Sequence, residues 1–300
     1  MKQNILSILG IFSICTCFPK TGKAQMDTLT QTQMAFQNAA WKIQLLDKAV
    51  VWATFHFQQK EIFNANENIH ILKFNTQQTD YKPYLRSAGD SLVRTSQLAK
   101  SDTSILAAIN GTFFDMKKGG SVDFIKIANK ILDTSRLTKN KLAEHQLAAI
   151  AFDSLGNTHI IQGDSLNPKW ANQLPYPTLM VTGPLLLKNG KPTFLRNVPF
   201  NYKRHPRSCI CVTEQNETIW MTIDGRTTES QGVSLIELTL LSQWLGCKDA
   251  INLDGGGSTT LYVKGQSDEG VVNMPCDNHL FDHSGERPVS NIIVLKPKTQ

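Results

Sequence analysis

Two apolar stretches in the first third of the chain predict a pair of β-strands. Residues 50–57 read Val-Val-Trp-Ala-Thr-Phe-His-Phe and residues 69–74 read Ile-His-Ile-Leu-Lys-Phe, so both are rich in β-branched and aromatic residues. Residues 27–50 carry apolar positions without a clear period and lead into the first of these strands. Residues 84–99 place apolar side chains at helical spacing and predict a helix, with Gly89 as its weakest point.

The second half of the chain shows a strand, a helix and another strand in that order. Residues 218–223 predict the first strand, and Ser234 with Glu237 forms the capping-box pattern that opens a helix. Gly246 ends this helix, and the short apolar segment 250–253 predicts the second strand. This spacing indicates a mixed α/β unit, and we expect an α+β fold with mixed β-sheets packed against helices.

Residues 1–24 have the pattern of a secretory signal peptide. Residues 5–18 are mainly apolar, and Gly22-Lys23-Ala24 places small residues at the positions that signal peptidase reads. A membrane anchor is the alternative, but the apolar run is shorter than the about 20 residues that a spanning helix needs. Lipid attachment at Cys15 or Cys17 remains open, although neither follows a convincing lipobox. We expect a periplasmic or secreted protein, cleaved after Ala24, with no membrane span once the leader is removed.

Composition is that of a globular protein with a substantial core. The chain has 300 residues, of which 41% are hydrophobic and 19% charged. No repeat or low-complexity linker divides it, so we expect residues 25–95 to pack, as strands and a helix, on a main domain of residues 96–300. Loss of Lys2, Lys20 and Lys23 with the leader lowers the formal charge from +6 to +3. So small an excess does not indicate a nucleic-acid partner.

Four cysteines remain after the leader: Cys209, Cys211, Cys247 and Cys276. Cys209 and Cys211 point the same way along a predicted strand, which makes them poor partners for each other. The spacing lacks the paired Cys-x-x-Cys units of a zinc ribbon. We therefore expect buried thiols or one disulfide, with Cys247 and Cys276 as the candidate pair, in preference to a zinc site.

An apolar strand that ends in a polar residue followed by glycine occurs three times. The polar residues are Asn110, Asp224 and Asp254. The carboxyl ends of strands are common ligand sites in open α/β sheets, and glycine lets a ligand approach the backbone. A single Asn-Gly or Asp-Gly pair is usually a simple turn, but three such ends predict a shared site.

The stretch Asp-Gly-Gly-Gly-Ser-Thr-Thr at residues 254–260 is the least ordinary in the chain. Three consecutive glycines cost backbone entropy, while exposed N–H groups and hydroxyls offer neutral hydrogen-bond donors. The stretch is not a P-loop, because no lysine follows the last glycine. It is not a nucleophile elbow either, because Ser258 does not lie between glycines. It predicts a donor loop beside the Asp254 carboxylate.

Several short motifs follow one another along the last two thirds of the chain. They are Asn110-Gly-Thr-Phe-Phe-Asp115, Val181-Thr-Gly-Pro-Leu-Leu186 with Asn189-Gly190-Lys191, Arg204 to Arg207, Asp224-Gly225-Arg226, Gly232-Val233-Ser234 with Glu237, Asn252 to Ser258, and Glu286-Arg-Pro-Val-Ser-Asn291. In this order they resemble the phosphodiester glycosidase family over roughly residues 100–295. The resemblance implies a single domain that hydrolyses the bond between the anomeric carbon of a sugar, GlcNAc-like first of all, and a phosphodiester or related oxygen.

The resemblance also implies roles for individual residues. Asp254 is the first candidate for a catalytic carboxylate, Asp224 the second and Asp115 the third. Binding of a phosphate or an acidic sugar group would use Arg207, Arg226 and Arg287. The remaining candidate substrate contacts are Asn110, Asn252, Gly255, Gly256 and Ser258.

Plainer interpretations of some of these residues stay open. Arg207 or Arg226 could instead pair with Glu229 or Glu286, as most surface arginines do. Glu237 is expected to complete the helix cap rather than to act in catalysis.

Two functions of other classes compete with hydrolysis at the sugar. A non-catalytic carbohydrate or anionic-glycan binding module would bind sugar without releasing a product. A metal-dependent phosphodiesterase would cleave on the phosphorus side and use Asp224, Asp254 and histidines as metal ligands. The histidines and aspartates of residues 277–283 resemble a metal cluster, although such a stretch is more often a solvated loop. We expect a carbohydrate or sugar-phosphate substrate, no cofactor and no bound metal.

Overall fold

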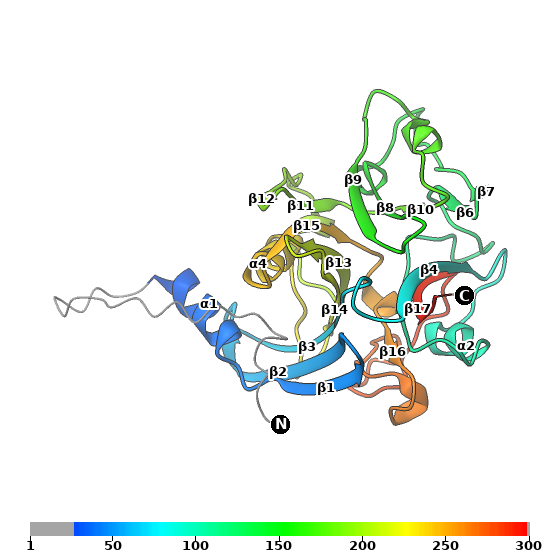
Figure 1. The fold of residues 1–300 in the computed structure, drawn as a ribbon. Helices are drawn as coiled ribbons and strands as arrows, with labels where there is room; N and C mark the ends of the chain where they lie inside the picture. Colours follow the sequence, from blue (N-terminus) through cyan, green and yellow to red (C-terminus); the bar gives the residue numbers. More distant parts are fainter. Residues whose placement is uncertain (1–26, 299–300) are drawn as a thin grey trace.

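The structure is a computed structural model and describes residues 27–298. The expected signal peptide, residues 1–24, lies outside the described residues. The described chain forms three β-sheets, of eight, five and four strands, with short helices around them (Figure 1).

The eight-stranded sheet is the centre of the fold. Its strands, in spatial order, are β1 (Lys42–Asp47), β2 (Val50–Ile62), β3 (Ala65–Phe74), β14 (Thr218–Ile223), β13 (Arg207–Thr213), β15 (Cys247–Asn252), β11 (Leu185–Lys188) and β12 (Lys191–Pro192). β13 is antiparallel to both β14 and β15. β14 and β15 therefore run in the same direction, so the residues that follow them lie at the same end of the sheet's strands.

Two smaller sheets complete the fold and lie beside the large one, at the top right and right of Figure 1. The five-stranded sheet has the order β7 (Lys130–Asp133), β6 (Ile125–Ile127), β10 (Thr178–Val181), β8 (Ala148–Phe152) and β9 (Thr158–Gln162). The four-stranded sheet has the order β16 (Leu261–Val263), β5 (Ala107–Asn110), β17 (Asn291–Pro297) and β4 (Tyr81–Ser87). Each of these neighbouring pairs is antiparallel.

The helices are short. The α-helices are α1 (Thr28–Gln37), α2 (Thr95–Lys100), α3 (Pro199–Tyr202) and α4 (Leu235–Trp244), and the 3₁₀ turns are η1 (Glu144–Gln146), η2 (Trp170–Gln173), η3 (Gly256–Ser258) and η4 (Asp268–Gly270). The predicted capping box of α4 is confirmed, because Ser234 Oγ accepts from Glu237 N–H at 3.2 Å and Glu237 Oε2 accepts from Ser234 N–H at 2.8 Å. None of the described helices is long and apolar enough to cross a membrane.

The central strands of the large sheet are buried on both faces, because their side chains alternate between two hydrophobic clusters. On β3, Leu72 packs with the smaller sheets, through residues such as Ile109 and Ile150. Its neighbour Ile71 packs on the opposite face with α4, through Leu238. This two-sided burial stabilises the central strands and confirms the α+β class.

The strands predicted at residues 50–57 and 69–74 are confirmed as parts of β2 and β3, which pair with each other. The helix predicted at residues 84–99 is wrong. Residues 81–87 form β4, which pairs along its whole length with β17, and only the six residues of α2 are helical. Gly89 adopts a φ of +65°, a conformation that an α-helix cannot contain. Pairing with a strand more than 200 residues away therefore overrides the local spacing.

The disulfide joins Cys211 to Cys247, with 5.8 Å between the two Cα atoms, so the expected Cys247–Cys276 pair is wrong. Cys211 and Cys247 lie on the adjacent strands β13 and β15, beside the register shift between Val212 and Thr213. Cys209 and Cys276 are buried free thiols.

Candidate active site

The structure brings the three polar strand ends together. Asn110, at the end of β5, is buried, and its Nδ2 donates to the backbone oxygen of Asp254 at 2.8 Å. Its Oδ1 accepts from Ser208 Oγ at 2.7 Å and from Thr260 N–H at 3.2 Å. The Asn110 amide thus connects β5, β13 and the loop that carries Asp254, and its hydrogen bonds are made within the protein.

Asp254 is half-buried at the first position of the glycine-rich loop. Its N–H donates to Gly111 O at 3.1 Å, and its Oδ1 accepts from Gly255 N–H at 2.9 Å. Burial raises the pKa of Asp254, and the Ser258 hydroxyl, the Gly255 N–H and the Arg287 charge offset only part of this rise. The charge of the nearby Asp123 adds to it. A carboxyl group with a raised pKa is suited to donate a proton.

The glycines after Asp254 leave room for two arginine-bearing loops. A Cβ on Gly257 would lie 1.8 Å from Asp277 Oδ1 and 2.6 Å from Arg287 Nη2. Gly256 has a φ of +62°, and a Cβ there would lie 2.8 Å from Arg226 Nη2. The glycine run is therefore explained by the close approach of these side chains to the loop.

The three predicted arginines have different surroundings. Arg207 is buried, and its guanidinium donates to Val233 O at 3.1 Å, Phe200 O at 2.6 Å and Lys203 O at 3.1 Å. Burial lowers its pKa to about 10, and the charge of Arg226 adds to the effect.

Arg287 is paired in a bidentate manner with Asp277, with both N···O distances 2.7 Å. Arg226 is exposed, and its Nη1 lies 3.7 Å from Cys276 Sγ. Neither Arg207 nor Arg226 forms an ion pair with a described carboxylate. Arg226 is thus the accessible guanidinium at the loop whose charge no described carboxylate neutralises.

The two other predicted carboxylates do not lie free beside Asp254. Asp224 is 1% exposed, and its oxygens accept from Asn68 Nδ2 and Asn273 Nδ2, both at 2.8 Å. Asn273 Nδ2 also donates to the backbone oxygen of Thr259 at 3.0 Å, which ties Asp224 to the same loop.

Asp115 binds Arg136 Nη1 at 2.6 Å and also accepts from the N–H groups of Lys117 and Lys118. These donors, Arg136 first, lower the pKa of Asp115 to about 2 and keep its carboxylate ionised.

Asn252, at the end of β15, and Ser258, within the loop, are both fully buried. Asn252 Nδ2 donates to Gly183 O at 2.8 Å and to Leu253 O at 2.6 Å. Its Oδ1 is buried and has no partner among the described residues. The Asn252 amide thus connects the end of β15 to the backbone at Gly183.

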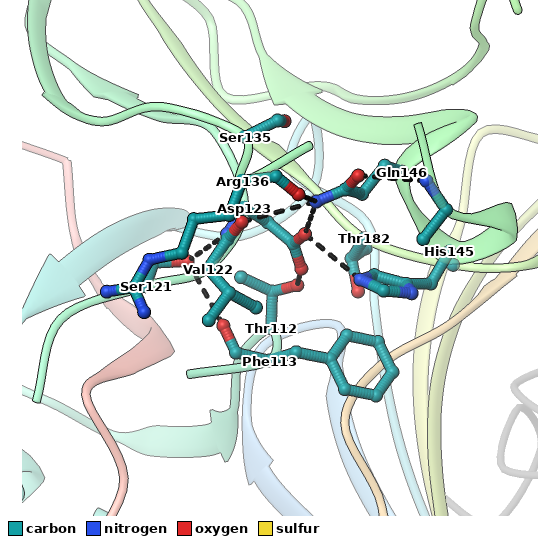
Figure 2. A network of polar contacts seen from close by, with 12 residues as sticks. Thr112, Phe113, Ser121, Val122, Asp123, Ser135, Arg136, His145, Gln146 and Thr182 are labelled. Carbon is teal, nitrogen blue, oxygen red and sulfur yellow. Dashed lines mark hydrogen bonds and ion pairs between the residues drawn. The ribbon is translucent and has the colours of Figure 1, made fainter. Parts of the chain in front are cut away.

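The prediction from sequence missed one buried carboxylate, Asp123, which is 0% exposed (Figure 2). Its Oδ2 accepts from Thr112 Oγ1 at 2.7 Å, and its Oδ1 accepts from Gln146 Nε2 at 2.9 Å and lies 3.2 Å from His145 Nε2. The His145 ring packs on Phe113 with 4.5 Å between centroids. The one local signal was a lone aspartate inside the apolar sequence Val-Asp-Phe-Ile; nothing in the sequence pointed to His145.

No metal site is formed by residues 27–298, since no three of their His, Cys, Asp or Glu side chains are grouped so as to hold an ion. In the 277–283 stretch, Asp277 pairs with Arg287, and His283 Nδ1 lies 2.8 Å from Asn273 O. A cleft of about 630 Å³ lies at the opposite end of β13 and β15, between His159, Tyr176 and Lys248. None of the predicted site residues lines it.

Comparison with known proteins gives a family and a fold. The family model described as phosphodiester glycosidase matches residues 103–296. The chain is 33% identical to the SPbeta prophage-derived uncharacterized protein YomE of Bacillus subtilis strain 168 over 84 residues, which are 27% of this chain and 13% of that protein.

Two solved structures share the fold. A hypothetical protein from Synechocystis matches with a TM-score of 0.67 and 16% identity, over 87% of this chain and 65% of that chain. The zebrafish N-acetylglucosamine-1-phosphodiester alpha-N-acetylglucosaminidase catalytic domain, auto-inhibited by its pro-peptide, matches with a TM-score of 0.63 and 17% identity, over 94% of this chain and 97% of that chain. At these identities the likeness shows the fold.

Proposed function

The chain belongs to the phosphodiester glycosidase family, and on that basis we propose that it hydrolyses the bond between the anomeric carbon of a sugar and a phosphodiester oxygen. The zebrafish protein of the same fold is named for N-acetylglucosamine 1-phosphodiesters. An α-linked N-acetylglucosamine is therefore the first candidate sugar for this chain as well.

The observation that carries this proposal is the pairing of a half-buried carboxyl group with an accessible guanidinium at one loop. Burial raises the pKa of Asp254, which favours its protonated form, and in that form Asp254 would donate to the leaving phosphate oxygen. Arg226, whose Nη2 lies against Gly256, would bind the charge of that phosphate. The two groups supply what departure of a phosphomonoester from the sugar requires.

The other predicted residues would support this pair. The N–H groups of Gly255 and Gly256 donate to Asp254 Oδ1 and to Pro206 O, both at 2.9 Å, and Ser258 is buried, so these predicted contacts shape the loop around Asp254. Arg207 and Arg287 add positive charge near Asp254, since both interact with it electrostatically. Asn110 and Asn252 keep the strand ends in place.

We also propose that the protein is exported. The leader pattern with cleavage after Ala24 is one support, and the Cys211–Cys247 disulfide is another, because disulfides persist in oxidising compartments. N-terminal sequencing of the mature protein would begin at Gln25, whereas a retained Met1 would contradict export.

Product analysis tests the proposed reaction directly. The purified protein is incubated with α-linked sugar 1-phosphodiesters, N-acetylglucosamine first, and free sugar and phosphomonoester are measured. We expect both products in equal amounts, and about 10³-fold slower release of both from the Asp254→Asn variant. Asp153→Asn is the matched control, because it makes the same chemical change in the Asp153–His159 pair beside the distal cleft and should leave turnover intact.

Two results would contradict the proposal. Release of sugar 1-phosphate would mean cleavage on the phosphorus side. Saturable sugar binding without any product, unchanged in Asp254→Asn, would instead indicate a carbohydrate-binding protein.

A further inference from the structure

Asp123 and His145 form a fixed carboxylate–imidazole couple. One edge of the imidazole is turned to Asp123, with Nε2 3.2 Å from Oδ1, while the side chain as a whole remains 27% exposed. The contact is a close charge pair and not an aligned hydrogen bond, and the negative charge of Asp123 favours the tautomer with the proton on Nε2. That tautomer leaves Nδ1 as a proton acceptor on the other edge of the ring.

The surroundings of Asp123 hold the couple rigidly. Gln146 Nε2 donates to Asp123 and also contacts Val122 O at 3.2 Å and Arg136 O at 3.3 Å, while Gln146 Oε1 accepts from Ala143 N–H at 3.0 Å. Together with the Thr112 hydroxyl, these contacts satisfy the carboxylate around its histidine partner.

The turn that carries His145 is anchored as well. The Glu144 carboxylate accepts from Arg196 N–H at 2.9 Å and from Asn201 Nδ2 at 3.0 Å. The imidazole face packs on Phe113. The position of the His145 side chain is thus determined by Asp123, by Phe113 and by the anchored turn. A histidine on an open surface has no such set of contacts.

Asp123 is connected to Asp254 through the backbone of residues 111 and 112. Asp254 N–H donates to Gly111 O, and the next residue, Thr112, donates its hydroxyl to Asp123. The charge of Asp123 is close enough to raise the pKa of Asp254.

Aromatic contacts form a second connection between His145 and Asp254. The Phe113 ring lies 6.0 Å from Phe200, and Phe200 in turn lies 4.8 Å from the guanidinium carbon of Arg207, a residue whose pKa responds to Asp254. Two chains of contacts thus connect His145 with Asp254, one through Asp123 and residues 111–112 and one through Phe113, Phe200 and Arg207.

We propose that His145 is a catalytic residue of the proposed hydrolysis, the base that takes a proton from the attacking water, and that Asp123 is its positioning residue. This inference rests on the proposed function. The water oxygen bonds to the anomeric carbon and its proton passes to His145 Nδ1. The bond from that carbon to the phosphate oxygen breaks, and its electron pair leaves with the phosphomonoester, which takes the proton of Asp254. Solvent then removes the proton from His145 and returns one to Asp254.

Chemical rescue tests this role. We expect His145→Ala to lower kcat by about 10²- to 10⁴-fold with little change in KM, as loss of a general base does. Added imidazole should restore part of kcat in a saturable manner, because the free base can occupy the vacated space. His159→Ala is the matched control: His159 pairs with Asp153 at 3.0 Å and lines the distal cleft, so its removal should change neither kcat nor the response to imidazole.

A structural measurement accompanies the kinetics and does not depend on turnover. Nitrogen chemical shifts of His145 should report the neutral tautomer with its proton on Nε2, and Asp123→Asn should abolish that preference while the protein remains folded by circular dichroism. A wild-type protein that turns over, with a His145→Ala variant within about twofold of it, overturns the role of His145 and leaves the proposed function standing. A folded His145→Ala variant that imidazole does not rescue also overturns it. A wild-type protein without turnover overturns both proposals.

Discussion

The Asp224–His70 pair and the Asp123–His145 pair have the same chemistry and different surroundings. Both carboxylates are fully buried, and each is tied by hydrogen bonds to the loop that begins at Asp254. His70 is only 4% exposed, lies 3.7 Å from Asp224 and stacks beneath Trp52, whereas the His145 side chain is 27% exposed. A buried carboxylate beside a histidine therefore does not identify a catalytic couple; access of the imidazole to substrate does.

The region around Asp224 holds further buried polar groups that fix the backbone. Glu67 is fully buried next to Asn68, and its Oε2 accepts from Gly232 N–H at 2.9 Å. Burial raises the pKa of Glu67 to about 9. These contacts hold the segment that carries Arg226. We therefore assign a structural role to the Asp224–His70 pair and a catalytic role to the Asp123–His145 pair.

The largest effect is expected at Asp254, which lies between the two pairs along the chain of hydrogen bonds. Asp254→Asn should lower kcat by about 10³-fold, because it removes the proposed proton donor and keeps the size of the side chain. Initial rates of free-sugar release measure this. A variant within about tenfold of the wild type would move the acid role elsewhere.

The same substitution in the two pairs tests the comparison itself. Asp123→Asn should lower kcat by about 10²-fold, since the amide no longer orients His145. Asp224→Asn should leave kcat of the folded protein nearly unchanged and reduce the free energy of unfolding by about 1–3 kcal/mol, since both of its amide partners remain buried. Rates and urea midpoints are measured on both variants. The comparison is wrong if Asp224→Asn is the one that loses turnover at unchanged stability.

A smaller effect, on KM, is expected at Arg226, which follows the buried Asp224 by two residues in the chain. Arg226→Ala should raise KM for a sugar phosphodiester about tenfold, through loss of one charge-assisted contact. An uncharged aryl glycoside of the same sugar serves as control and should not be affected. Equal losses on both substrates would show that Arg226 supports the loop rather than the phosphate.

The smallest effect concerns stability and its pH dependence. The folded-state pKa of Glu67, about 9, lies above its ordinary value of 4.5, so its favourable contribution is complete below pH 4.5 and is lost as the pH rises towards 9. Glu67→Gln should match the wild type near pH 4 and have a Tm a few degrees higher at pH 8. Thermal melts at both pH values decide this, and a constant difference between the proteins would refute the assignment.

Local patterns in the sequence predicted those parts of the fold that local hydrogen bonds and side-chain alternation determine. The capping box of α4, the strands β2, β3 and β14, and the three polar strand ends were all readable from short stretches of chain. The motifs around Asp254 likewise indicated the family, which the match over residues 103–296 then confirmed.

Tertiary structure decided what depends on pairing between distant segments. Residues 81–87 carry a helical spacing and become a strand because β17 offers hydrogen bonds along their whole length. Cys247 joins Cys211 because β13 and β15 are neighbouring strands of the large sheet. Asp123 and His145 come from a loop and a short 3₁₀ turn, where no period or motif exists to mark them. Their juxtaposition arises only when the sheets pack, and burial then gives a carboxylate and an imidazole a role that neither has alone in the sequence.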